Sequence, residues 1–251
     1  MRTTLWLLGL TVGLFLSGAP GDKMQENKEQ PAKPCRVLLI TGRDVKAHDW
    51  RTTTPVLREH LEQGGKFEVV VCEEPLVLES SALDSYDVIL LNYYNHEWPS
   101  ITPHARENLL AFVKGGKGLV PFHFSCRAFQ DWPEYRNLVG RIWVTGSGHG
   151  PRGTFKSKVV NKDHFITQGV EDFEADDELY AKLVGEAKIN VLVEGYSDWS
   201  KQVEPLAWTL EYGKGRVFNI VFGHDVKACR NPQFARLLQR GTEWVASRQV
   251  K

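Results

Sequence analysis

The sequence has no excess of charge of either sign. Its 251 residues contain 31 Lys and Arg and 31 Asp and Glu, and no run of basic residues interrupts this balance. A protein that binds a phosphate backbone or an acidic membrane surface through its charge carries a basic patch. The composition therefore predicts no nucleic-acid partner.

Long apolar runs are also missing once the first residues are set aside. Residues 5–16 are apolar but too short to span a bilayer; they follow Arg2 and precede the small residues Ser17-Gly18-Ala19. This pattern predicts a signal peptide at residues 1–19, an exported protein that is periplasmic or extracellular, and no membrane span after signal removal. Residues 20–34 are polar and bounded by proline, which predicts a flexible leader before a single domain at 35–251.

The domain contains short apolar runs that do not alternate with polar residues. They lie at 36–40, 69–71, 87–92 and 118–123, and helical patterns at 56–63 and 104–114 begin after Thr-Pro and end at Gly-Gly. Runs of this kind suit strands buried on both faces, so we expect an α/β, flavodoxin-like, doubly wound and mainly parallel sheet. The second half adds expected strands at 155–160, 189–194, 205–210 and 216–222 and a final helix at 233–246.

Six of the eight histidines follow expected strands or lie in the loops of the second half. They are His48, His96, His123, His149, His164 and His224. The ligand crevice of such a sheet lies at the carboxyl ends of its strands, and imidazole with carboxylate suits a divalent transition metal. The sequence has no HExxH or CxxC motif, so placement alone makes His123, His149 and His224 candidate ligands of a divalent metal such as zinc.

Carboxylates and aromatic rings accompany the histidines. Asp177 and Glu178 precede Tyr180, and several Trp and Tyr residues lie in expected loops or at strand ends. Flat rings beside polar side chains can stack on a sugar while the polar groups bind its hydroxyls. We therefore expect a small-molecule carbohydrate as the partner, with these candidate binding residues: His48, Trp50, Asn92, Trp98, His149, Tyr180 and Asp225.

Four sequence pieces, in this order and spacing, resemble a known family. They are residues 116–123 (GKGLVPFH), 164–169 (HFITQG), 177–180 (DELY) and 213–218 (GKGRVF) running into Gly223-His224-Asp225. The chain thus resembles the trehalose-utilisation (ThuA-like) family, a branch of the class I glutamine amidotransferase-like fold, over roughly residues 36–247. It departs from the family pattern at Phe165 and at Phe124, where a second histidine often follows His123.

The resemblance argues against glutamine hydrolysis through a cysteine. The amidotransferases place a Cys nucleophile on a strained turn after the fourth strand, and here that position holds His123. Cys126 lies three residues further on and is a weaker candidate nucleophile. An exported chain with four cysteines can also form disulfides, and Cys126 with Cys229 is the pair expected to lie near one edge of the sheet.

The family implies a role in carbohydrate utilisation and leaves two functions open. In the first, the chain is a sugar hydrolase, lyase or isomerase acting on a disaccharide or keto-sugar derivative, with His123, His224, Asp177 and Glu178 as catalytic residues. In the second, it is a non-catalytic sugar-binding module on an amidotransferase-like scaffold. A third interpretation gives the histidines only structural hydrogen bonds at the strand ends. Catalytic or metal-binding roles require these side chains to converge within a few ångströms, and a pH-rate profile on plain and oxidised disaccharides separates the enzyme from the binding module.

Overall fold

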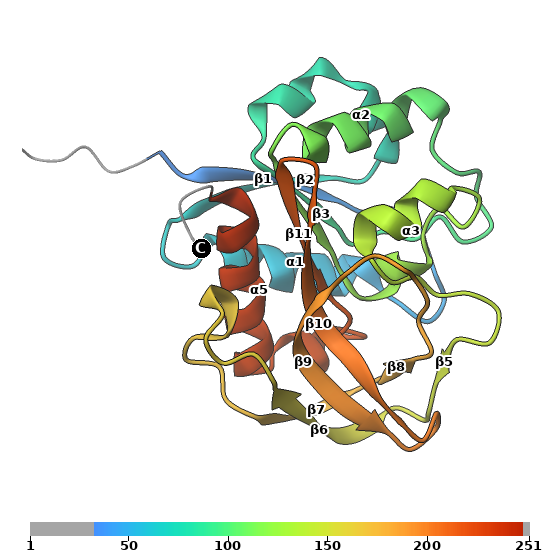
Figure 1. Cartoon of the computed structure of the whole chain (residues 1–251). Coiled ribbons are helices and arrows are strands. Elements are labelled where there is room, and N and C mark those ends of the chain that lie inside the picture. Colours follow the sequence, from blue (N-terminus) through green and yellow to red (C-terminus); the bar gives the residue numbers. More distant parts are fainter. Residues whose placement is uncertain (1–32, 248–251) are drawn as a thin grey trace, which may run out of the picture. The chain divides into compact units, whose positions relative to one another are not determined.

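A computed structural model of the chain describes residues 33–247. The expected signal peptide and nearly all of the expected leader lie outside these residues. The described part is built on a nine-stranded sheet with the strand order β2-β1-β3-β4-β11-β10-β9-β6-β7 (Figure 1). Its strands are β1 (Cys35–Ile40), β2 (Phe67–Cys72), β3 (Val88–Leu91), β4 (Gly118–Pro121), β6 (Gly153–Val159), β7 (Phe173–Asp177), β9 (Asn190–Ser197), β10 (Gln202–Tyr212) and β11 (Gly215–Ile220).

One half of the sheet is parallel. Strand β1 pairs with β2 and β3, β3 pairs with β4, and β4 pairs with β11, all in parallel register. Every residue of β3 and of β4 is buried. This explains their apolar, non-alternating sequences, because helices cover both faces of these strands. The α/β, flavodoxin-like fold is confirmed.

The other half of the sheet is antiparallel. Strands β10 and β11 form a hairpin, and β9, β6 and β7 follow with each pair antiparallel. Gly213 adopts a φ of 64° in the hairpin turn, a conformation that glycine reaches without strain. A separate two-stranded sheet pairs β5 (Gly148–His149) with β8 (Tyr180–Ala181).

Helices cover the two faces of the sheet. On one face α1 (Trp50–Glu62) packs against α4 (Val226–Cys229) and α5 (Pro232–Ala246), whereas α2 (Pro103–Lys114) and α3 (Pro133–Val139) lie on the other (Figure 1). The short 3-10 helices are η1 (Pro75–Glu79), η2 (Ser81–Ser85), η3 (His123–Arg127) and η4 (Phe165–Thr167). A Cβ atom on Gly241 of α5 would clash with the ring of Phe218 on β11, so this glycine allows the helix to approach the sheet closely.

The helix boundary signals hold for two of the three long helices. Thr102 caps α2, Asn231 caps α5, and each helix begins with a proline, as expected. Helix α1 instead begins at Trp50 with Asp49 as its cap, so Pro55 lies inside it. The expected start at Thr54-Pro55 was wrong because Asp49 accepts the backbone N–H of Arg51 and caps the chain one turn earlier.

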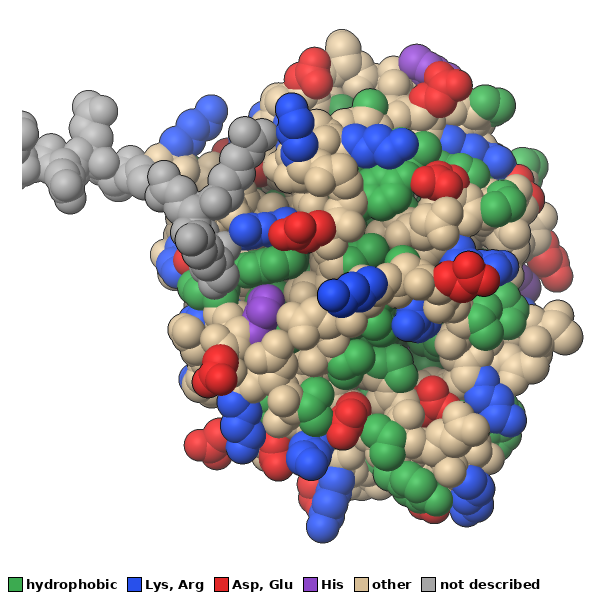
Figure 2. Space-filling model, viewed as in Figure 1, with side chains coloured by type: hydrophobic (Ala, Val, Ile, Leu, Met, Phe, Trp, Pro, Cys, Tyr) green, Lys and Arg blue, Asp and Glu red, His purple; other side chains and the backbone are tan. Residues whose placement is uncertain are grey.

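Basic and acidic side chains are interspersed over the face of the molecule shown in Figure 2. Most charged side chains that form ion pairs lie at the surface, for example Arg58 with Glu62 on α1. Within residues 33–247, none of the helices has the length and apolar character needed to cross a membrane.

Candidate functional site

Four side chains from distant segments converge beyond the carboxyl ends of the parallel strands. His48 comes from the loop after β1, His123 from the first position of η3 after β4, Glu178 from the segment after β7, and His224 from the loop after β11. One ligating atom from each of these residues lies within 4.8 Å of those of the other three. We call these four residues the histidine cluster.

His123 is held in a fixed orientation. Its backbone φ is 46°, a left-handed conformation that is costly for a non-glycine residue, and its side chain is buried. Its Nδ1 lies 2.8 Å from the carbonyl oxygen of Val221. Because a carbonyl can only accept, Nδ1 carries the proton and the lone pair of Nε2 points into the cluster, which is the arrangement usual for metal-binding histidines.

Two of the imidazoles are neutral at neutral pH. Burial, together with the nearby charge of His224, lowers the pKa of His48 to about 4. Burial, reinforced by the neighbouring His48, lowers the pKa of His123 well below its ordinary value. Metals bind the neutral form of imidazole, so both side chains are ready to act as ligands.

Glu178 and His224 form an ion pair within the cluster. Nδ1 of His224 lies 3.1 Å from Oε2 of Glu178, and the two side chains are mostly buried. The hydrogen bond to Glu178 raises the pKa of His224. Burial alone would raise the pKa of Glu178, but the hydrogen bond and charge of His224 hold it below its ordinary value.

The donor set fits a divalent transition metal. Three imidazoles and one carboxylate are ligands that zinc accepts in proteins. Nδ1 of His48 is buried and has no partner in hydrogen-bond geometry among the described residues. The nitrogen and carboxylate lone pairs of the cluster lie close together, and two of the imidazoles are neutral. A bound cation stabilises such an arrangement.

Tyr180 and His149 border the cluster from the small sheet, where they are paired across β5 and β8. The hydroxyl of Tyr180 lies 2.9 Å from Nε2 of His123 and 3.4 Å from Nε2 of His48. Nδ1 of His149 donates to the carbonyl of Gly150, and its Nε2 lies 3.6 Å from Oε1 of Glu178. Of the three candidate ligands, His123 and His224 belong to the histidine cluster and His149 lies beside it; His48 and Glu178 are the other two members of the cluster.

Asp177 lies next to Glu178 in the chain but turns away from the cluster. Its carboxylate accepts the backbone N–H groups of Gly223 at 2.6 Å, Glu178 at 2.8 Å and His224 at 3.1 Å. It is buried, and burial raises its pKa to about 6 despite these bonds. Asp177, predicted as catalytic, thus ties the end of β7 to the loop that carries His224.

Four predicted binding residues have structural partners instead of facing the cluster. Asn92 is buried and donates to the hydroxyls of Thr53 and Thr54 on α1. The ring of Trp50 is buried, and its Nε1 donates to Asp44. These contacts fix the start of α1, directly after His48.

The other two are Asp225 and Trp98. Asp225 caps α4 and pairs with Arg152 at 2.8 Å. Trp98 is exposed, and the guanidinium of Arg43 lies 4.6 Å from its ring centroid.

The predicted disulfide was wrong. Cys126 and Cys229 are both buried and both free. Cys126 lies in η3, where its carbonyl accepts from Trp143, whereas Cys229 ends α4 and its thiol faces the carbonyl of Gly223. Burial raises the pKa of the Cys126 thiol to about 12, which also argues against a nucleophilic role.

Aromatic rings line the cluster, and the sequence did not single out all of them. Phe124 stacks on His48 with 4.7 Å between ring centroids and 4° between planes. The ring of Trp143 meets Tyr180 at 5.0 Å, and Tyr94 meets Phe124 at 6.5 Å. Phe124 therefore borders the histidine cluster on the side of His48.

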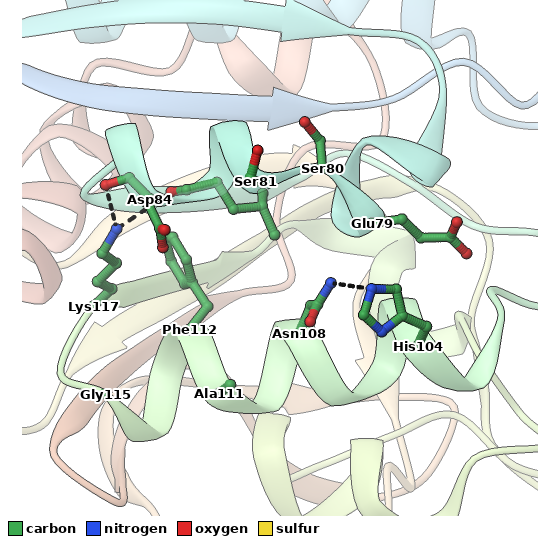
Figure 3. Close-up of a pocket in the computed structure, with 11 residues that line it drawn as sticks. Glu79, Ser80, Ser81, Asp84, His104, Asn108, Ala111, Phe112, Gly115 and Lys117 are labelled. Carbon is green, nitrogen blue, oxygen red and sulfur yellow. Dashed lines mark hydrogen bonds between the residues drawn. The ribbon is translucent and has the colours of Figure 1, made fainter.

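A separate hollow of about 510 Å³ lies between η1, η2 and α2 (Figure 3). Two of its polar side chains already have protein partners: Lys117 donates to the carbonyls of Leu83 and Asp84, and Asn108 lies 3.3 Å from His104. None of the residues that line it belongs to the cluster. The hollow and the histidine cluster are therefore separate features of the molecule.

The sequence profile of the ThuA family, described as trehalose utilisation, matches residues 36–245. The chain belongs to the ThuA family. No curated protein was similar enough to count as a match.

Solved structures of ThuA-like proteins share the fold. A ThuA-like protein from Parabacteroides merdae is 27% identical, with a TM-score of 0.77 over 87% of this chain and 92% of the other. A ThuA-like protein from Bacteroides uniformis is 18% identical, with a TM-score of 0.68 over 92% of this chain and 96% of the other.

The expectation of export is contradicted by two further structural neighbours. Both come from Salmonella typhimurium and are named cytoplasmic proteins; one is 16% identical, with a TM-score of 0.60 over 83% of this chain and 98% of the other. The expectation depended on a short apolar stretch and three small residues, which lie outside the described residues. Export is therefore withdrawn.

Proposed function

We propose that the chain is an enzyme of carbohydrate utilisation that acts on a disaccharide or its keto derivative at a divalent metal held by the histidine cluster. The ThuA family has a carbohydrate-related role in trehalose utilisation. The observation that supports an enzyme is the convergence of His48, His123, Glu178 and His224 within 4.8 Å. If these side chains served only as hydrogen-bond partners at strand ends, they would not need to lie together in one cluster.

The four cluster residues would hold the metal. When bound, it would polarise a substrate carbonyl or lower the pKa of a bound water. His123 is oriented for this by its Nδ1–H bond to Val221, and the pKa values of His48 and His123 keep both rings neutral. Asp177 positions two members of the set through the backbone N–H groups of Glu178 and His224.

His149 is the side chain placed to accept a proton. Its Nδ1–H donates to Gly150, so the lone pair of Nε2 is available, and it stands outside the four metal ligands. A keto group makes the neighbouring C–H acidic, and His149 would remove that proton. In an isomerisation the imidazolium would return the proton to the adjacent carbon; in an elimination the glycosidic C–O bond would break and the oxygen of the leaving sugar would take the proton from the imidazolium. Glu178, 3.6 Å away, would stabilise the imidazolium that forms.

Tyr180 is the hydrogen-bond donor of the site. Burial raises its pKa well above the ordinary value, so the phenol keeps its proton and donates to His123 or to a substrate oxygen. Simple glycoside hydrolysis by two opposed carboxylates is disfavoured, because the oxygens of Asp177 accept from three backbone amides and only Glu178 faces the cluster.

The test measures turnover of trehalose and of a keto derivative of trehalose by zinc-loaded protein, with and without a chelator. We expect turnover that the chelator abolishes. The His149→Ala variant should lose at least about 100-fold in kcat, the usual contribution of a general base, while its zinc content and Tm stay close to those of the wild type. His104→Ala, an exposed residue on α2, is the matched control.

Binding of the sugars without conversion would contradict the proposal and favour the sugar-binding module. Full activity in His149→Ala would reject His149 as the base. Full activity in the chelated protein would reject the metal.

A further inference from the structure

Arg127 lies beside the histidine cluster and has no carboxylate partner among the described residues. It ends η3, which begins with His123, and its side chain is exposed. Its guanidinium carbon lies 5.5 Å from the ring centroid of Tyr94 and 5.6 Å from that of Trp143. Among residues 33–247, no ion pair and no side-chain hydrogen bond engages this guanidinium.

The two rings that hold Arg127 lead directly to the cluster. Trp143 contacts Tyr180, whose hydroxyl bonds to His123. Tyr94 contacts Phe124, which stacks on His48. Arg127 therefore lies at the border of the site, and on either route only two aromatic residues separate it from a cluster histidine.

The nearby carboxylates are already matched. Glu178 pairs with His224, and Asp177 accepts three backbone N–H groups. By contrast, Arg152 at the same end of the sheet pairs with Asp176 and Asp225. The positive charge of Arg127 is thus left for a group that comes from outside the protein.

The contacts of Arg127 leave its hydrogen-bond donors available. A cation–π contact uses the face of an aromatic ring, and the N–H groups of a guanidinium point outward in its own plane. That planar fork matches the two oxygens of a carboxylate or a phosphate. The aromatic contacts also restrict the side chain before a ligand arrives, which lowers the entropy lost on binding.

We propose that Arg127 forms a subsite for an anionic group, a carboxylate or a phosphate ester, on the carbohydrate that reacts at the histidine cluster. The inference rests on the proposed function for the identity of the ligand as a carbohydrate. It adds that the preferred substrate is a charged sugar, selected by Arg127.

The test is calorimetric titration of the zinc-loaded protein with three probes: trehalose, a phosphate ester of trehalose, and a disaccharide containing a uronic acid. We expect one anionic probe to bind about tenfold more tightly than trehalose, as a charge-assisted hydrogen bond provides. Arg127→Gln should remove that preference and leave the Kd for trehalose within about twofold. Arg58→Gln, on the exposed face of α1, is the matched control and should keep the preference.

The two anionic probes distinguish a phosphate from a carboxylate. Equal affinity of the wild type for all three probes overturns the proposal, and so does a preference that survives in Arg127→Gln. An equal loss of affinity for all three probes in that variant also overturns the proposal. Arg127 would then bind only sugar hydroxyls or hold Trp143 in place. If no probe is converted but the preference depends on Arg127, the enzyme proposal fails and the subsite stands.

Discussion

Replacing Glu178 with Gln should change how the stability of the metal-free protein depends on pH. Nδ1 of His224 and Oε2 of Glu178 lie 3.1 Å apart, and 17% and 11% of their side chains are exposed. A hydrogen bond between charged groups at this degree of burial contributes about 2 kcal/mol. The Gln variant keeps the shape of the side chain and removes its charge.

The directions of the two pKa shifts set the pH range of this effect. The pKa of His224 is raised from 6.5, so its contribution is fully present below that pH and is lost as the pH rises through the folded-state pKa. The pKa of Glu178 is lowered from 4.5, so its contribution is present above that pH and is lost as the pH falls through the folded-state pKa. The ion pair therefore stabilises the protein most between these two limits.

Urea unfolding of chelator-treated protein measures the effect. As the pH rises from about 5.5 to about 9, the free energy of unfolding of the wild type should fall by about 2 kcal/mol more than that of Glu178→Gln. The control is Glu59→Gln, which removes an exposed pair with Arg230 whose partner stays charged over this range. Parallel pH profiles for the wild type and Glu178→Gln would refute the coupling of the two side chains.

Three other predictions concern side chains around the cluster. Asp177→Ala leaves three backbone N–H groups without their acceptor, so urea unfolding should show a loss of about 3 kcal/mol or more; a loss below about 1 kcal/mol would be incompatible with this anchoring role. Trp143→Ala should raise the KM for the sugar about tenfold because the ring borders the site, whereas Trp98→Ala, which lies over Arg43, should leave KM unchanged; equal effects of the two changes would reject Trp143 as a wall. Thiol titration of the unfolded, unreduced protein should detect all four cysteines, and a count of two would restore the Cys126–Cys229 bridge.

The parallel half of the fold could be predicted from the sequence because its strands are buried on both faces. Non-alternating apolar runs marked β1, β3 and β4 to within a few residues. Since parallel strands end at the same edge of a sheet, placing His123 and His224 at strand ends was enough to bring them together. His60 shows the limit of this logic: it lies in the expected helix at 56–63 and not at a strand end, yet it is buried and bonds to the carbonyl of Cys229.

Orientation within the site could not be predicted. Asp177 and Glu178 are neighbours in sequence, yet one binds backbone amides and the other faces the histidines, because the direction of each side chain depends on how the chain leaves β7. His48 belongs to a loop whose path is fixed by the cap of α1, and no periodic pattern reports that path. Arg127 is four residues after His123 in a short helix, and only contacts with Tyr94 and Trp143 from other segments place it at the site.

Metal content tests the central claim most directly. Wild-type protein incubated with zinc and passed through a desalting column should retain about one zinc per chain by elemental analysis. His123→Ala and Glu178→Gln should retain much less, while His104→Ala should match the wild type. A wild type that retains no metal, or cluster variants that retain as much as the wild type, would contradict a metal centre built from His48, His123, Glu178 and His224.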